Sequence, residues 1–177
     1  MAERRLFLAL MPEPAVRDAL AKAALTLHKA CGGWRTRNDM LHLTLVFIGA
    51  TSDADTARLV DALARFQFAP FIFDLARFGT WQPGIGWLAP LDDCAPLKAL
   101  VAALRALLTE LGIRFDAKHF SPHVTLLRHG GPADRLPADV AIHWSISNLA
   151  LVESVSDARG ASYRILAMCS AREGECE

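Results

Sequence analysis

The sequence carries no excess of charge of either sign. Its 19 Lys and Arg residues balance 19 Asp and Glu residues, so the formal net charge is +0 and the isoelectric point is near 7.0. Proteins that attract duplex DNA or an anionic membrane over a distance carry a broad positive field. We therefore expect neither duplex DNA nor a membrane as a partner, and we expect any contact with nucleic acid to be local.

Cysteine is scarce, and its few residues form no metal-binding pattern. Cys31, Cys94, Cys169 and Cys176 include no CxxC pair and no Cys–His spacing of the zinc-finger type. Such isolated cysteines indicate reduced thiols and a cytoplasmic location. We expect no metal and no other cofactor.

Long apolar runs are missing as well. The run at positions 6–10 follows two arginines, but Pro12 and Pro14 close it after five residues, which is too short for a signal peptide. No later run reaches the ~18 uncharged residues of a membrane span. The 177 residues, 53% of them hydrophobic, instead predict one globular domain over positions 1–177, which can bury roughly two-thirds of its unfolded surface without disulfides. We expect a monomer.

The order of predicted elements indicates the fold class. Apolar residues at helical spacing, with start and stop signals, predict helices at positions 14–30, 53–63 and 95–111. Short β-rich segments predict strands at 6–10, 41–48, 71–77, 86–89, 120–127, 142–146, 149–152 and 163–166. Because the last three strands follow one another without helices, we expect an α+β fold with antiparallel sheets.

One short segment occurs twice. Leu41-His42-Leu43-Thr44-Leu45 returns 81 residues later as Pro122-His123-Val124-Thr125-Leu126, both times within a predicted strand. Six His and eight Thr in this chain predict only about 0.3 His-x-Thr triplets by chance. One copy in each half of the chain, each followed by leucine, makes coincidence a poor explanation.

The repeated triplet places two polar groups on one face of a strand. Because side chains alternate, His42 and Thr44 share a face, with Leu43, Leu45 and Phe47 on the other. If the two copies face each other, they enclose a small anion between two histidines and two hydroxyls. Such a site could open a cyclic phosphodiester without a metal, since one ring can take a proton from water while the other protonates the departing sugar oxygen.

Other interpretations of the repeat remain open at this stage. Two strand histidines and two threonines can simply form a satisfied polar face. A protein with this site could also be a catalytically silent module that binds RNA ends or cyclic nucleotides. A metal-dependent hydrolase is a third possibility, because His119 and His123 have i, i+4 spacing, although Pro122 between them disfavours a helix.

The segments around the repeat resemble the 2H phosphoesterases, a family with two His-x-Thr/Ser motifs in one chain. The resemblance is closest to the RNA 2′,3′-cyclic phosphodiesterases, historically called 2′-5′ RNA ligases. It rests on RLFLAL at 5–10, NDMLHLTLVFIG at 38–49, GWL at 86–88 and FSPHVTLLR at 120–128, with Glu153, Ser154 and Tyr163 near the end.

The resemblance implies a fold and a set of roles. It implies a bilobal α+β fold, in which two intertwined, pseudo-symmetric lobes of antiparallel sheet and helices surround a central cleft. It implies hydrolysis of RNA 2′,3′-cyclic phosphate ends, or of small cyclic nucleotides, to a 2′-phosphate. In this family the first histidine donates a proton and the second accepts one, which assigns His42 and His123, and Thr44 and Thr125 bind phosphate.

Further residues near the motifs are candidates for substrate contacts. Arg128 follows the second motif, and strand alternation turns it away from His123, so it reaches the phosphate only if the strand bends; otherwise it is a surface residue. Lys118 and His119 are candidates for the mouth of the cleft, with solvated loop residues as the alternative. Phe7 and Trp87 could stack on a terminal base, with core packing as the alternative.

Overall fold

The computed structural model describes residues 3–82, 84–157 and 160–172, which hold three α-helices, one short 3₁₀ helix and nine strands. In chain order the elements are β1 (Glu3–Leu10), α1 (Pro14–Cys31), β2 (Trp34–Arg35), the 3₁₀ turn η1 (Asn38–Met40), β3 (Leu43–Ser52), α2 (Asp53–Arg65), β4 (Phe71–Trp81), β5 (Ile85–Pro90), α3 (Ala95–Glu110), β6 (Val124–Arg128), β7 (Ile142–Ile146), β8 (Asn148–Asp157) and β9 (Gly160–Ser170). The predicted α+β class is confirmed, and no helix in this part of the chain is long and apolar enough to cross a membrane.

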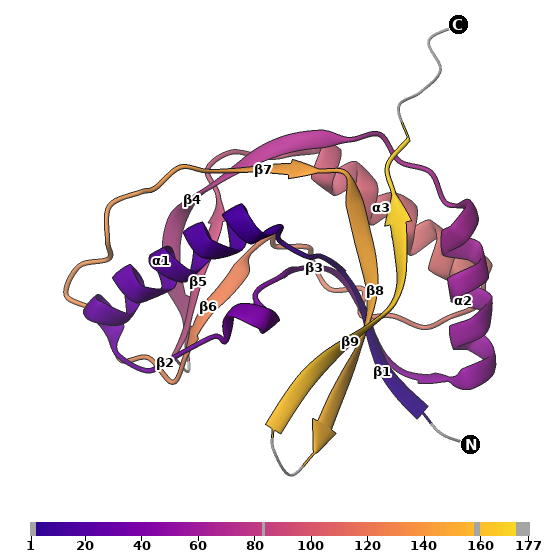
Figure 1. Cartoon of the computed structure of the whole chain (residues 1–177), viewed down its shortest axis with the longest axis horizontal. Coiled ribbons are helices and arrows are strands. Elements are labelled where there is room, and N and C mark those ends of the chain that lie inside the picture. The colour runs from indigo at the N-terminus through magenta and orange to yellow at the C-terminus, as the bar shows by residue number, and fades with distance from the viewer. Residues whose placement is uncertain (1–2, 83, 158–159, 173–177) are drawn as a thin grey trace, which may run out of the picture.

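The strands form one curled sheet in the order β7-β4-β5-β6-β3-β1-β8-β9, and β2 pairs with β6 off this path. All of these pairings are antiparallel. In Figure 1 the sheet bends like an arch, with β4, β5 and β6 on one side and β1, β8 and β9 on the other. The curl makes the sheet an open half-barrel.

Each helix begins and ends where its sequence provides a cap or a stop. Proline occupies the first turn of α1, where a missing N–H costs nothing, and Gly32 ends the helix at a positive φ of 63°. The hydroxyl of Ser52 accepts a hydrogen bond from the Asp55 N–H at 3.1 Å and so caps α2. Each helix turns a largely apolar stripe that includes leucines toward the core that it shares with the sheet.

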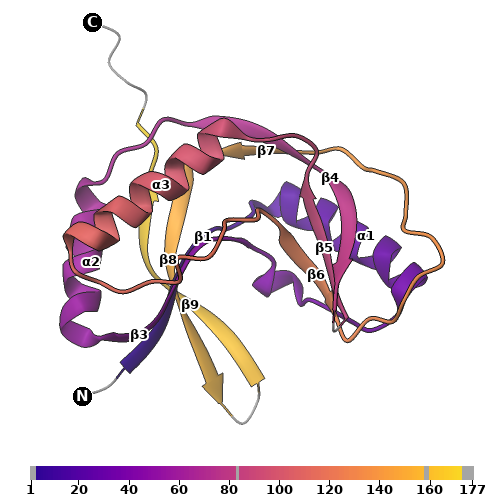
Figure 2. The same cartoon turned by 180° about the vertical axis from the view of Figure 1, so that it is seen from behind.

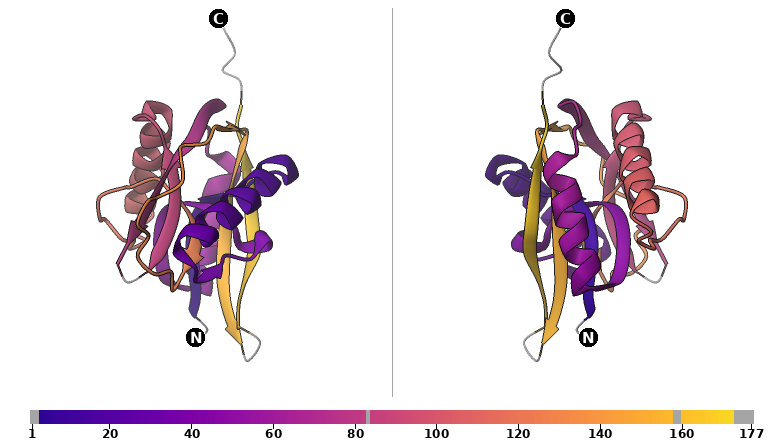
Figure 3. Two further views of the ribbon diagram at one scale, coloured as in Figure 1. Left: turned by 90° about the vertical axis from the view of Figure 1, so that its left-hand side faces the viewer. Right: turned by 90° about the vertical axis from the view of Figure 1, so that its right-hand side faces the viewer.

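The helices cross between the two halves of the sheet. Helix α1 follows β1 in the chain but packs against β5, β6 and β7 in the other half, whereas α2 packs against β1, β3 and β9. Helix α3 contacts β3. Figures 2 and 3 show α1 and α3 on opposite sides of the strands. Helices α1 and α3 therefore connect the two halves, because each follows a strand of one half in the chain and packs against the other half.

The two halves meet at the pairing of β3 with β6, which we call the seam. A single residue pair, Leu43 with Val124, joins these strands, and both side chains are fully buried. Four strands lie along the sheet on either side of the seam. The seam is therefore where the two repeated segments come together.

The structure shifts several predicted boundaries. Both motif strands begin one residue after their histidine, at Leu43 and Val124, rather than at positions 41 and 120. Pro122 has no N–H for a sheet hydrogen bond, which accounts for the late start of β6. Strands β4 and β5 pair as an antiparallel hairpin, in which β4 continues to Trp81 rather than ending at position 77. Cys176 lies outside the described residues.

Candidate active site

The structure brings the two His-x-Thr segments side by side at the seam. Leu43 and Val124 are opposite each other in an antiparallel pair and point into the core. Their neighbours project to the other face, so that His42 lies across from Thr125 and Thr44 lies across from His123. The four side chains that the sequence singled out therefore share one face, while their roles stay predictions.

Both histidines are held by the same local contact. Nδ1 of His42 donates to the carbonyl of Met40 at 2.7 Å, and Nδ1 of His123 donates to the carbonyl of Ser121 at 2.8 Å. A carbonyl only accepts, so Nδ1 carries the proton and Nε2 of each neutral ring is an acceptor. The Thr44 hydroxyl lies 3.0 Å from Nε2 of His42 and donates to it. Each ring thus presents Nε2 to the cleft.

Burial lowers the pKa of both histidines below the ordinary value. For His42, burial is the main cause, the hydrogen bond to Met40 opposes it, and the positive charges of His123 and Arg128 lower the pKa further. For His123, burial lowers the pKa and the hydrogen bond to Ser121 opposes it. The influence of His123 on His42 indicates that the two rings lie close enough to sense each other's charge.

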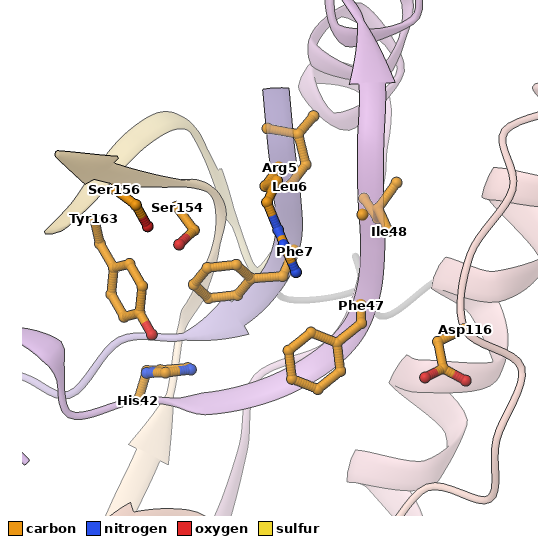
Figure 4. Close-up of a pocket in the computed structure, with 11 residues that line it drawn as sticks. Arg5, Leu6, Phe7, His42, Phe47, Ile48, Asp116, Ser154, Ser156 and Tyr163 are labelled. Atoms are coloured by element: carbon orange, nitrogen blue, oxygen red, sulfur yellow. The ribbon is translucent and has the colours of Figure 1, made fainter. Parts of the chain in front are cut away.

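Aromatic side chains surround the two imidazoles. Trp81 meets the His123 ring edge-on, with centroids 4.5 Å apart, and Tyr163 meets the His42 ring in the same way at 5.1 Å. Phe7 packs at 5.1 Å against His42. In Figure 4 the Tyr163 hydroxyl points toward His42, and burial raises the pKa of this phenol, which keeps its proton. These contacts fix the orientation of both rings.

Three hollows open from the four motif side chains. The largest, of about 560 Å³, is lined by His42, Phe7 and Tyr163 and continues to Arg5 (Figure 4). We call it the β1 hollow. It is large enough for a nucleoside, and its volume is the largest of the three.

The two smaller hollows carry most of the positive charge around the cleft. The one beside Thr44 and His123 has a volume of about 300 Å³ and includes Lys118 and His119, the residues expected at the mouth of the cleft. The other has a volume of about 280 Å³ and contains three arginines, Arg35, Arg37 and Arg128. Its remaining lining residues are Trp34, Thr36, Met40, His42, Thr125, Ala161 and Tyr163. The cationic side chains of these two hollows make the surface around the four motif side chains basic, although the formal net charge of the whole chain is zero.

A bulge in β6 brings Arg128 to the site. Thr125 pairs with Trp87 and Leu127 pairs with Gly86, so Leu126 is an extra residue between two successive residues of β5. Such a bulge reverses the alternation of side chains beyond it. Arg128 consequently lines the same hollow as Thr125. Of the two alternatives for this residue, a bent strand that brings it to the site and a plain surface position, the structure has the bent strand.

The first motif contains the same bulge, and it corrects one prediction. On β3, Thr44 pairs with Ala9 and Val46 pairs with Leu8, so Leu45 is the extra residue. Strand alternation predicted Phe47 on the buried face, but this side chain is 56% exposed and lines the β1 hollow. The bulge is the physical reason for the error.

The aromatic residues available to a ligand differ from those the sequence singled out. Phe7 is only 4% exposed, and Trp87 packs beside Trp81 with ring centroids 5.1 Å apart. Phe47 and Trp81 are the more exposed aromatic faces beside the histidines, and sequence reasoning missed both as site residues. Two consecutive apolar residues after each threonine were the available signal for the bulge that turns Phe47 outward.

Metal ligands are not grouped in this region. Within residues 3–82, 84–157 and 160–172, no three His, Cys, Asp or Glu side chains are arranged to hold a metal ion. His119 and His123 are not on a common helix, because the chain between α3 and β6 contains no helix. The helical metal pair considered from their spacing is therefore wrong.

Known proteins share this sequence pattern and fold. A family model described as LigT like Phosphoesterase matches residues 10–87. A Thermus thermophilus protein named RNA 2′,3′-cyclic phosphodiesterase is 34% identical, over 95% of this chain and 90% of that protein. An Escherichia coli protein with the same name is 30% identical, over 80% of this chain and 81% of that protein.

Solved structures have the same curled sheet and three helices. The crystal structure of E. coli LigT complexed with 3′-AMP superimposes with a TM-score of 0.84 at 25% identity, over 97% of this chain and 100% of that one. The crystal structure of TT0787 from T. thermophilus gives a TM-score of 0.82 at 28% identity, over 96% and 99% of the two chains. The likeness thus extends over almost the whole molecule.

Proposed function

Because the chain belongs to the LigT-like family of RNA 2′,3′-cyclic phosphodiesterases, we propose that it hydrolyses the 2′,3′-cyclic phosphate at an RNA end to a 2′-phosphate. In this reaction a bond forms between water oxygen and phosphorus, and the bond between phosphorus and O3′ breaks. The water loses a proton and O3′ gains one. Small 2′,3′-cyclic nucleotides contain the same reacting group and are substrates as well.

The two histidines carry the proton transfers in this proposal. His123 accepts the proton of the attacking water at Nε2, and His42 gives the proton on its Nε2 to the departing O3′. The observation that supports proton transfer by both rings most directly is that each is anchored through Nδ1 to a carbonyl two residues back, at 2.7 and 2.8 Å, whereas the order of the two roles follows the family resemblance. Both rings are thereby held with Nε2 turned away from the anchoring carbonyl, and in His42 this nitrogen contacts the Thr44 hydroxyl at 3.0 Å.

The remaining motif residues hold the phosphate. Thr44, Thr125 and Arg128 donate hydrogen bonds to the non-bridging oxygens, whose negative charge persists through the transition state. Arg128 and Thr125 line one hollow together, and Thr44 lines the neighbouring one. The phosphate therefore sits across the seam, between donors from both strands.

The proposal extends to the organisation of the chain. We propose that residues 1–177 form one domain, a monomer, made of two intertwined and pseudo-symmetric lobes that share the cleft. Support comes from the four strands on either side of the seam and from the matching bulges at Leu45 and Leu126. Helix α1, which packs on the half opposite its preceding strand, supports the intertwining.

One assay tests the reaction, its product and the need for metal together. A short RNA with a terminal 2′,3′-cyclic phosphate is incubated with the protein and EDTA, and the phosphate isomer is identified by chromatography. We expect a 2′-phosphate at an undiminished rate. A 3′-phosphate product would mean that the bond between phosphorus and O2′ breaks instead of the bond to O3′. Loss of activity in EDTA would indicate a metal-dependent mechanism. Tight binding of the RNA without turnover would identify the protein as a silent binding module.

A further inference from the structure

We infer that Arg5, with Ser154 and Ser156, binds the phosphodiester group on the 5′ side of the terminal nucleotide of an RNA substrate. This inference rests on the proposed function and extends it from the reacting phosphate to the next phosphate of the chain. The site is the end of the β1 hollow farthest from the seam (Figure 4). Its ligand is a phosphodiester or phosphate monoester anion.

The sheet register assembles the three donors on one face. Arg5 is directly opposite Ser154 in the pairing of β1 with β8, and Ser156 lies two residues further along β8. Residues opposite each other in a sheet, and residues two apart on a strand, share a face. All three line the β1 hollow, where a guanidinium and two hydroxyls offer donors to a single anion.

Arg5 is the unpaired cation of this hollow. Its neighbour Arg4 points to the opposite face, where it contacts Asp53 at 2.8 Å and Glu153 at 3.3 Å. In the described part of the chain, no acidic side chain forms an ion pair with Arg5. Among the described side chains that line the hollow, Asp116 is the one carboxylate, and it already accepts a hydrogen bond from the N–H of Lys118 at 3.0 Å and faces its ammonium group at 3.4 Å. The charge of Arg5 therefore remains available to a ligand.

The position of Arg5 suits the nucleotide that carries the reacting phosphate. In the proposed mechanism the departing O3′ receives its proton from His42, so the ribose lies on the His42 side of the phosphorus, at the entrance of the β1 hollow. Phe7 packs 5.1 Å from the His42 ring, and Arg5 lies two residues before it on the same strand, about 6.6 Å further from the seam. A ribose ring and its C5′ group separate the two phosphates of a nucleotide, and the β1 hollow provides that span.

Recognition at Arg5 distinguishes RNA ends from free cyclic mononucleosides. Adenosine 2′,3′-cyclic phosphate contains the reacting group but has no phosphate at its 5′ side. The dinucleotide ApA with a terminal 2′,3′-cyclic phosphate has one. We therefore expect the parent protein to have a higher kcat/KM for the dinucleotide, and we expect Arg5→Ala to remove that preference.

The experiment compares these two substrates with four proteins at low salt. The proteins are the parent, Arg5→Ala, Arg35→Ala as a test of the rival hollow beside Arg128, and Arg65→Ala as a matched loss of charge at the exposed end of α2. For Arg5→Ala we expect kcat/KM for the dinucleotide to fall about tenfold, equivalent to about 1.4 kcal/mol, with no change for the mononucleoside. We also expect the slope of log kcat/KM against log salt concentration for the dinucleotide to become shallower in this variant, by about the amount that one phosphate contact contributes.

The other outcomes separate this inference from the proposed function. A fall confined to Arg35→Ala would move the 5′ phosphate to the hollow beside Arg128 and overturn the inference. Equal losses on both substrates in Arg5→Ala, or no loss on either, would overturn it as well, while leaving the phosphodiesterase activity in place. If the parent hydrolyses neither substrate, the proposed function itself fails. The exposed positions of Arg5, Arg35 and Arg65 leave the fold intact in all three variants.

Discussion

The pH dependence of catalysis is the sharpest consequence of the buried histidine pair. The mechanism needs one neutral and one protonated ring, and the pKa values of His42 and His123 both lie below the ordinary value of 6.5 because burial disfavours the charged form. At pH 7.5 the protonated fraction of either ring is therefore below about one-tenth. The cyclic phosphate is a monoanion throughout this range and adds no titration of its own.

The expected profile of kcat/KM is a bell with its maximum below pH 6.5. Well above that maximum the value falls about tenfold for each pH unit, so we expect kcat/KM at pH 8.5 to be between about one-hundredth and about one-twenty-fifth of its value at pH 6.5. In the complex, the bound anion favours the charged rings and shifts the profile of kcat to higher pH. We therefore expect the pH profile of kcat to lie at higher pH than the pH profile of kcat/KM.

Initial rates on a cyclic-phosphate dinucleotide, measured from pH 4.5 to 9 at constant ionic strength, test this reasoning. Subsaturating substrate gives kcat/KM and saturating substrate gives kcat. Far-ultraviolet circular dichroism at each pH verifies that the protein remains folded. A value of kcat/KM that is constant or increasing from pH 6.5 to 8.5 would refute the claim that the free protein must protonate a buried histidine.

Two further predictions concern the seam itself. Replacing His42 or His123 by alanine should lower kcat by about 10²–10⁴-fold with little change in circular dichroism, and full activity in either variant would exclude the acid/base pair. Leu126→Ala should lower the free energy of unfolding by about 2–5 kcal/mol in urea titrations, because this bulged side chain is fully buried. The exposed Leu25→Ala in α1 should change it by less than about 0.5 kcal/mol, and equal effects would contradict the packing argument.

The sequence predicts the pairing of the two motifs because the same local pattern occurs twice. Alternation within a strand places each histidine and its threonine on one face, and the observed seam brings both faces together. Caps and stops predict the helices equally well, since Ser52 and Gly32 act within a few residues of their own position.

Features that depend on pairing between distant strands are harder to predict. Regular alternation fails after Thr44 and Thr125, because an extra leucine in each strand faces no residue on the partner. The contacts of Trp81 and Tyr163 with the imidazoles depend on long β4 and β9 strands, whose lengths the local pattern underestimates. Arg5 lies in the RLFLAL segment that resembles the family, but only the register opposite Ser154 places it in the hollow.

The two bulges occur at corresponding positions of the two motifs but orient different side chains. In each copy the fifth residue after the histidine turns into the cleft, and these residues are Phe47 in one copy and Arg128 in the other. At this position one copy consequently has an aromatic, uncharged side chain, whereas the other has a cation. A cyclic phosphate has distinct ends, a sugar and an exposed anion, so in the proposed reaction this difference favours one orientation of the bound substrate. The two copies thus present similar histidines with unlike neighbours.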